Sequence, residues 1–151
     1  MANVPGTTEA RKAIVQTALT YLENLRKEAG GDPGLLWELA GAYERVGDVQ
    51  WRTVFSHVGD TPGALASYSR AEEILTKLAR PGEARAELQL GWIYLRQGQV
   101  RKAMGEADAS MGSYSRAREI THRLLQKSPR DPKLLDLAIE LHATMTESLS
   151  A

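Results

Sequence analysis

The stretch Ser67-Tyr68-Ser69-Arg70-Ala71 recurs unchanged at positions 113–117 of this 151-residue chain. Internal repetition is informative, because a repeated supersecondary unit determines the whole architecture. A Tyr-x-Arg-x-Gly motif stands upstream of each copy, ending at Gly47 and at Gly98, and Asp32-Pro33 is echoed by Asp131-Pro132. These matched features predict a helical hairpin that is used about twice, with single helices at each end.

Apolar residues recur at helical spacing along almost the whole chain, and no alternating strand pattern competes with them. In the first segment the apolar stripe runs from Ile14 to Leu25. Asp32-Pro33 and Asp131-Pro132 are typical of a helix start, with an N-cap followed by proline at the first helical position. The predicted fold class is therefore all-α, a stack of antiparallel helical hairpins with about six helices.

We expect one domain over residues 8–149, preceded by a flexible leader at residues 1–7. Its expected parts are an N-terminal helix at 8–29, a repeat at 33–80, a second repeat at 83–127 and a capping helix at 132–149. Extra residues are expected as inserts at the turns inside the repeats. The first insert covers about residues 48–60 and the second about residues 99–104.

The two repeats share an order of small and aromatic residues. In the first repeat the order is Leu39-Ala40, Tyr43, Gly47, Gly59-Asp60, Ala64, Tyr68 and Ala71. In the second it is Leu90-Gly91, Tyr94, Gly98, Gly105, Ser110, Tyr114 and Ala117. This order resembles the tetratricopeptide repeat family over about residues 33–142, although the spacing is longer than the usual ~34 residues. The resemblance implies paired helices that cross closely and bind a protein or peptide without catalysis.

The resemblance also implies a ligand-facing row on the first helix of each pair. The partner-binding residues implied in this chain are Trp37, Glu44, Arg45, Arg85, Leu88, Trp92, Leu95 and Arg96. The row would continue on the last helix at Lys133, Asp136 and Glu140. Tryptophan and arginine are enriched in binding hot spots. The alternative is that the tryptophans pack between repeats and the charges are merely solvated.

A narrower resemblance concerns residues 43–50, followed by Gly59-Asp60 and residues 64–68. This pattern is similar to repeat regions that follow the catalytic domain of some bacterial serine/threonine protein kinases. It implies a docking or regulatory segment of a larger signalling protein. The kinase signatures themselves, a glycine-rich loop, His-Arg-Asp and Asp-Phe-Gly, are missing from this sequence.

Composition narrows the remaining classes. Lys and Arg number 19 and Asp and Glu number 19, which argues against a nucleic-acid partner because such proteins need a basic excess. The absence of cysteine leaves no thiolate metal site and suits a cytoplasmic location. No apolar run approaches the ~20 residues of a membrane span. The three histidines are far apart, so no metal or cofactor is expected, and a small helical enzyme or ligand-binding domain is the least favoured interpretation.

Self-assembly is the second interpretation of function. In this interpretation the partner-binding surfaces bind a second copy of the chain and form a homodimer. Short repeat arrays also have apolar ends that need capping; residues 1–31 and the last helix are expected to cap them, and the alternative is an end-to-end or swapped dimer. The first insert, with Trp51 and Phe55, is expected to cover a hairpin end; the alternative is an exposed apolar patch for a partner. His142 stands at the position matching Tyr43 and is expected to pack between helices.

Overall fold

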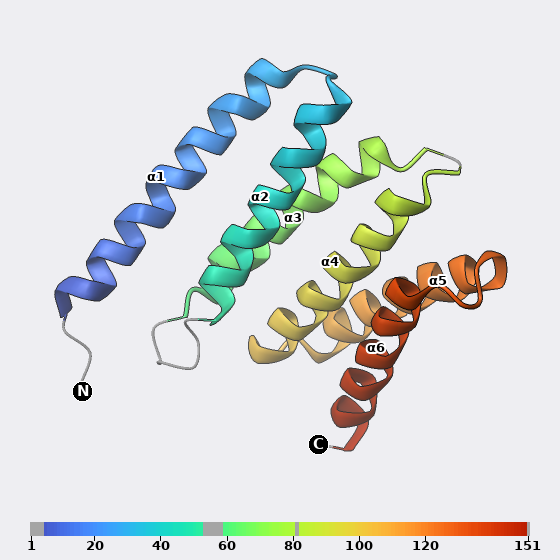
Figure 1. Cartoon of the computed structure of the whole chain (residues 1–151). Helices are drawn as coiled ribbons and strands as arrows, with labels where there is room; N and C mark the ends of the chain where they lie inside the picture. Colours follow the sequence, from blue (N-terminus) through green and yellow to red (C-terminus); the bar gives the residue numbers. More distant parts are fainter. Residues whose placement is uncertain (1–4, 53–58, 81, 151) are drawn as a thin grey trace. The chain divides into compact units, whose positions relative to one another are not determined.

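Helices make up nearly all of the structure, a computed structural model that describes residues 5–52, 59–80 and 82–150. The helices are α1 (Pro5–Ala29), α2 (Pro33–Arg52), α3 (Thr61–Leu78), α4 (Ala84–Ala103), α5 (Ala107–Lys127) and α6 (Pro132–Ser150) (Figure 1). No strand occurs in the described residues, so the all-α prediction is confirmed. The chain divides into two compact units, Met1–Ile74 and Leu75–Ala151. The expectation that residues 8–149 act as one domain stays a prediction.

The Asp-Pro signals mark helix starts as predicted. The Asp32 carboxylate accepts a hydrogen bond from the backbone N–H of Gly34 at 3.1 Å, and its carbonyl accepts one from Leu36 at 3.0 Å. Asp131 makes the same two hydrogen bonds, both at 3.0 Å, with the residues two and four positions further on. Both aspartates therefore occupy N-cap positions and satisfy backbone donors that the first helical turn leaves without partners.

The first helix is longer than predicted. It begins at Pro5 rather than at residue 8, so residues 5–7 belong to the helix and not to a flexible leader. Proline suits this position, because the N–H that it lacks has no partner in a first turn. Glu9 then lies in the second turn, with a carboxylate oxygen 3.9 Å from the Lys12 ammonium. Residues 1–4 lie outside the described residues.

Both expected inserts are shorter than predicted, because helices continue into them. α2 runs to Arg52 and α4 runs to Ala103. The continuation has a physical reason: Val100 has 0% and Gln50 has 5% of its surface exposed, so the extra turns place side chains in the interior. Of the rest of the first insert, residues 53–58, which include Phe55, lie outside the described residues.

The tyrosine of the repeated pentapeptide makes the same packing contact in each unit. Tyr68 on α3 packs its ring on Gly47 of α2, where a Cβ would lie 2.7 Å from Cε1 of that ring. Tyr114 on α5 packs in the same way on Gly98 of α4. Both tyrosines have 0% of their surface exposed. The two hairpins therefore have the same tyrosine-on-glycine crossing.

Small residues line the same two crossings. Ala64, Ala71 and Ala117 are fully buried, and Ser110 is buried at the position that corresponds to Ala64. The Ser110 hydroxyl donates a hydrogen bond to the carbonyl of Gly98 at 2.7 Å. Serine is accepted in place of alanine here because its buried hydroxyl has a partner.

The two buried tyrosines differ at their hydroxyl groups. The Tyr68 hydroxyl donates to Oδ1 of Asp48 at 2.5 Å. In the second copy Gln99 follows the glycine where Asp48 follows it in the first, and the Tyr114 hydroxyl has no hydrogen-bond partner among the described residues. Burial raises the pKa of Tyr114. The copies therefore keep the shape of the crossing but not its polar contact.

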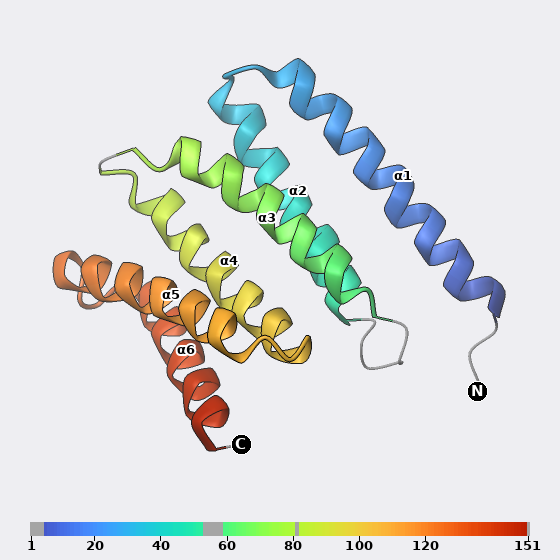
Figure 2. The ribbon, with the colours of Figure 1, turned by 180° about the vertical axis from the view of Figure 1, so that it is seen from behind.

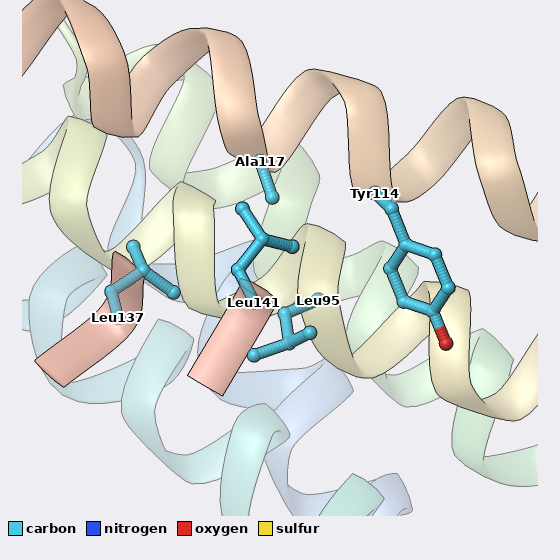
Figure 3. Packing of buried hydrophobic residues seen from close by; sticks show 5 residues of the cluster. All are labelled: Leu95, Tyr114, Ala117, Leu137 and Leu141. Carbon is cyan, nitrogen blue, oxygen red and sulfur yellow. The ribbon is translucent and has the colours of Figure 1, made fainter. Parts of the chain in front are cut away.

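In the second unit α5 packs against both α4 and α6, and these two helices lie on the same side of α5 (Figures 1 and 2). The core between them is built from one residue of α4, two of α5 and two of α6. These are Leu95, Tyr114, Ala117, Leu137 and Leu141 (Figure 3). Close approach of α4 and α6 requires a residue without a side chain at Gly91, where a Cβ would lie 2.7 Å from Cδ2 of Leu137.

Candidate functional site

Three of the predicted partner-binding residues share one face of α4. Leu88, Trp92 and Arg96 follow one another at four-residue spacing, which places them in line on a helix. Leu88 and Trp92 are half-buried and pack on the core cluster of the second unit. The guanidinium carbon of Arg96 lies 5.9 Å from the centroid of the Trp92 ring, at cation–π distance. All three side chains keep part of their surface in solvent.

Leu95 lies seven residues after Leu88 and nearly in line with it, but it is fully buried. It has 0% of its surface exposed and lies in the core with Tyr114, Leu137 and Leu141 (Figure 3). The prediction that it contacts a partner is therefore wrong. The physical reason is that residues of α5 and α6 cover its side of α4.

The remaining predicted residues lie at the start of α4 or on α2. Arg85 is exposed. In the first unit, Trp37 and Glu44 are half-buried and Arg45 is exposed. The Arg45 side chain lies along the helix over Gly41, where a Cβ would be 3.3 Å from its Nη1. These α2 residues form a candidate surface of the first unit, which is described by itself.

The predicted continuation of the row on α6 reaches solvent. Lys133, Asp136 and Glu140 are all exposed. His142 is exposed as well, so the expectation that it packs between helices is wrong. Its counterpart Tyr43 is buried, because α2 has neighbouring helices on a side where α6, within the described residues, has none.

A charged cluster that the sequence did not reveal joins the three helices of the first unit. Glu23 of α1 accepts a hydrogen bond from the Tyr43 hydroxyl of α2 at 2.9 Å. Two nitrogens of Arg26 also donate to it, Nη2 at 2.6 Å and Nε at 3.3 Å. Arg70 of α3 lies 3.7 Å from the same carboxylate and 3.1 Å from Glu73. The Glu23 carboxylate therefore links α1 to both α2 and α3.

The cluster shifts the ionisation of its members. The Arg26 hydrogen bond is the main cause that lowers the pKa of Glu23 from 4.5 to about 2. Burial, followed by the hydrogen bond to Glu23, raises the pKa of Tyr43 from 10.0 to about 12. Around neutral pH the cluster is therefore one carboxylate held by two arginines and a neutral phenol.

Glu23→Gln is expected to lower the free energy of unfolding by about 1 kcal/mol at pH 7, a modest value because the ion pairs are part-exposed. The Glu23 pKa is lower in the folded state than in the unfolded state. Its stabilising contribution is therefore fully present above pH 4.5 and is lost as the pH falls toward 2. Urea unfolding of both proteins between these limits measures the effect. If the free energies of unfolding of the two proteins differed by the same amount at pH 4.5 and near pH 2, Glu23 would not have the lowered pKa described here.

The arginine of the repeated pentapeptide has a different contact in each copy. Arg70 reaches the Glu23 carboxylate, whereas the guanidinium carbon of Arg116 lies 5.6 Å from the centroid of the Tyr94 ring. The repetition of this arginine was the only sign in the sequence that it had a structural role. Its contacts were not predictable, because they depend on which side chain the neighbouring helix presents.

α4 carries a basic excess. It contains Arg85, Arg96, Arg101 and Lys102 against a single acid, Glu87. The Glu87 carboxylate is held by Nη2 of Arg123 at 2.6 Å. α4 as a whole is thus positive in a chain whose formal net charge is zero, although one of its cations, Arg101, lies 3.6 Å from the Glu106 carboxylate. Such a basic excess favours ligands that carry carboxylates.

Metal and membrane features were sought in residues 5–52, 59–80 and 82–150. In this part of the chain no three His, Asp or Glu side chains come together as a metal site would need. None of its helices has the length and apolar character to cross a bilayer. In comparisons with known proteins, no family model, no curated protein and no solved structure matches this chain.

Proposed function

We propose that this chain is a non-catalytic module that binds a protein or peptide through the face of α4 formed by Leu88, Trp92 and Arg96. The pairing of Trp92 with Arg96 carries the proposal. A half-buried indole below a guanidinium group offers apolar area and directed donors side by side, the combination found in interface hot spots. Because Trp92 packs on the core, little side-chain freedom is lost when a ligand binds.

The basic excess of α4 favours an acidic ligand. Arginine binds carboxylates through two parallel hydrogen bonds, and Leu88 adds apolar surface next to Trp92. The expected partner is therefore a segment with carboxylates spaced around one apolar side chain. Arg85, one turn before Leu88, would extend the basic part of the surface.

The tetratricopeptide resemblance over residues 33–142 supports the same function. The tyrosine-on-glycine crossings are packing of the kind that the resemblance implies. As the narrower kinase resemblance suggests, we propose that the module is a docking or regulatory segment of a larger bacterial signalling protein in the cytoplasm.

The proposal is tested by selecting ligands from a random peptide library and measuring their affinity by calorimetry. We expect the selected peptides to be acidic. The Trp92→Ala, Arg96→Glu double variant should bind them at least about tenfold more weakly, because two hot-spot side chains are removed. Circular dichroism of the variant should match that of the wild type.

Arg118→Glu provides a matched control, since it reverses one exposed charge on α5 outside the proposed face. It should retain the wild-type affinity. Equal weakening in both variants would indicate a general charge effect and contradict the assignment to α4. Loss of binding only in a Trp37→Ala, Arg45→Glu variant would move the site to α2.

A further inference from the structure

The turns between α1 and α2 and between α5 and α6 have the same three hydrogen bonds around their aspartates, although the first turn passes through Gly30 at a φ of 55° and the second through Ser128 at a φ of −138°. The backbone N–H of Asp32 donates to the carbonyl of Ala29 at 3.1 Å, and that of Asp131 donates to the carbonyl of Ser128 at 3.2 Å. The capping bonds of the two aspartates also match. The two turns are offset by 99 residues (131 − 32). Each residue of α5 and α6 therefore has a counterpart 99 positions earlier, in α1 and α2.

α6 exposes the face that α2 buries. In α2 this face meets α3, through Gly47 below Tyr68 and through a hydrogen bond of 2.6 Å from Ser67 to Gln50. The buried residues of this face are Leu36, Ala40, Tyr43 and Gln50. Their counterparts on α6 are Leu135, Ile139, His142 and Leu149. The exposed fractions are 41% for Leu135, 68% for Ile139 and 77% for Leu149, and His142 is exposed too.

α1 exposes the face that α5 turns toward α4. On α5 this side includes Ile120, whose Cγ2 would lie 3.9 Å from a Cβ on Gly91. The counterparts of Ser113 and Ile120, 99 positions earlier, are Ile14 and Tyr21. Ile14 is 69% exposed and Tyr21 is 63% exposed. The exposed side chains of Ile14 and Tyr21 on α1 therefore lie at positions where α5 has α4 packed against it.

We propose that these two faces bind each other between copies of this chain, with α6 of one copy packed antiparallel on α1 of another. α1 corresponds to α5 by the offset of 99 residues. α6 corresponds to α4 as well as to α2, because Tyr94 and His142 lie equally far beyond Pro81 and Pro129. α6 and α1 are therefore the counterparts of the two helices of the α4–α5 hairpin. In the proposed contact, α1 of the second copy packs on α6 as α5 packs on α4, and α6 packs on α1 as α4 packs on α5.

The charges beside the two stripes are complementary. From residue 134 to residue 150, α6 has Asp136, Glu140 and Glu147 and neither lysine nor arginine. Of these three acids, antiparallel packing places Glu147 opposite the first half of α1, which has Arg11 and Lys12 against Glu9, with Lys12 3.9 Å from the Glu9 carboxylate. Opposite signs across the contact favour a second copy over a like-charged partner and help to fix which ends of the helices meet.

The α4–α5 contacts predict the register of the new pair. Ile139 is 48 residues after Gly91, and Tyr21 is 99 residues before Ile120, so the contact between Gly91 and Ile120 becomes a contact between Ile139 and Tyr21. By the same two offsets, the contact between Gly98 and Tyr114 predicts a contact between Thr146 and Val15. Glu147 then lies near the turn of α1 that carries Arg11.

Light scattering and sedimentation equilibrium from micromolar to submillimolar concentration test the association. We expect the wild type to form dimers or longer head-to-tail assemblies, since both follow from a contact between two different faces. Ile139→Glu should raise the apparent dissociation constant at least about tenfold, because the contact would bury an unpaired charge. Val49→Glu, at another position that is 50% exposed, should leave it unchanged.

Single cysteines test the register, since the chain contains no cysteine of its own. We expect oxidation of a mixture of Tyr21→Cys and Ile139→Cys proteins to give mainly the mixed disulfide between two chains. A mixture of Val49→Cys and Ile139→Cys should not. A wild type that stays monomeric throughout, or assemblies that survive Ile139→Glu, would overturn the proposal and assign the α6 face to a further helix or to another protein.

Discussion

Gly98→Ala is expected to lower the free energy of unfolding by about 2 kcal/mol or more, although alanine is the better helix former by about 1 kcal/mol. The added Cβ would overlap the Tyr114 ring, which is fully buried and has no open side to move into. Relief would require the α4–α5 crossing to widen, and that would disturb the core on which Leu137 and Leu141 also pack. Urea unfolding followed by circular dichroism measures the difference.

Gly112→Ala is the matched control, because a Cβ at this exposed position of α5 would meet nothing within 4 Å. It should raise the free energy of unfolding by about 0.5–1 kcal/mol, since alanine restricts the unfolded chain and favours the helix. Gly47→Ala, the counterpart of Gly98 in the first unit, should destabilise like Gly98→Ala. If Gly98→Ala and Gly112→Ala changed stability in the same direction, the tyrosine-on-glycine crossing would not be the feature that the repeat preserves.

The sequence predicted the parts of the fold that depend on local chemistry and repetition. The Asp-Pro pairs located the starts of α2 and α6, because capping and proline geometry act within a few residues. α1 ends as predicted before Gly30, which adopts a φ of 55° that favours glycine. The repeated pentapeptide predicted two equivalent crossings, because identical residues at equivalent positions pack in the same way.

The sequence did not predict features that depend on a neighbouring helix. The second insert was expected from the extra length of the repeat, but α4 continues through most of it, and one of its residues, Val100, is buried. Glu23 gave no sign in the sequence that it would meet Tyr43, 20 residues away, and Arg70, 47 residues away. Apolar periodicity indicates which face of a helix is covered, but it does not show how many neighbours cover it.

Leu95 illustrates the same limit within the candidate site. The family pattern assigned it to the ligand-facing row, and Arg96, the next residue, does lie on the exposed face with Trp92. Neighbouring residues on a helix point about 100° apart, so Arg96 points away from Leu95. Leu88, seven residues before Leu95, points nearly the same way as Leu95, so the two leucines differ in how fully the cluster covers them and not in direction. The row on α4 is therefore narrower than predicted, and its apolar part is Leu88 and Trp92.

Leu95→Ala should consequently act on stability rather than on binding alone, and we expect it to lower the free energy of unfolding by about 2–5 kcal/mol. The lost side chain is fully buried against α5 and α6 and would leave a cavity that the fixed crossing of α4 and α5 cannot close. Val49→Ala, which truncates a side chain that is 50% exposed, should change stability by no more than about 0.5 kcal/mol.

Thermal and urea unfolding of the two variants separate the interpretations of Leu95. If Leu95 were a ligand contact, its replacement would leave stability nearly unchanged and weaken peptide binding as strongly as Trp92→Ala does. If it is a core residue, unfolding shifts first, and the folded fraction of Leu95→Ala still binds, because Trp92 and Arg96 remain on the surface. The latter outcome is expected, because a residue without exposed surface reaches a ligand only after the packing of α4 against α5 and α6 has been lost.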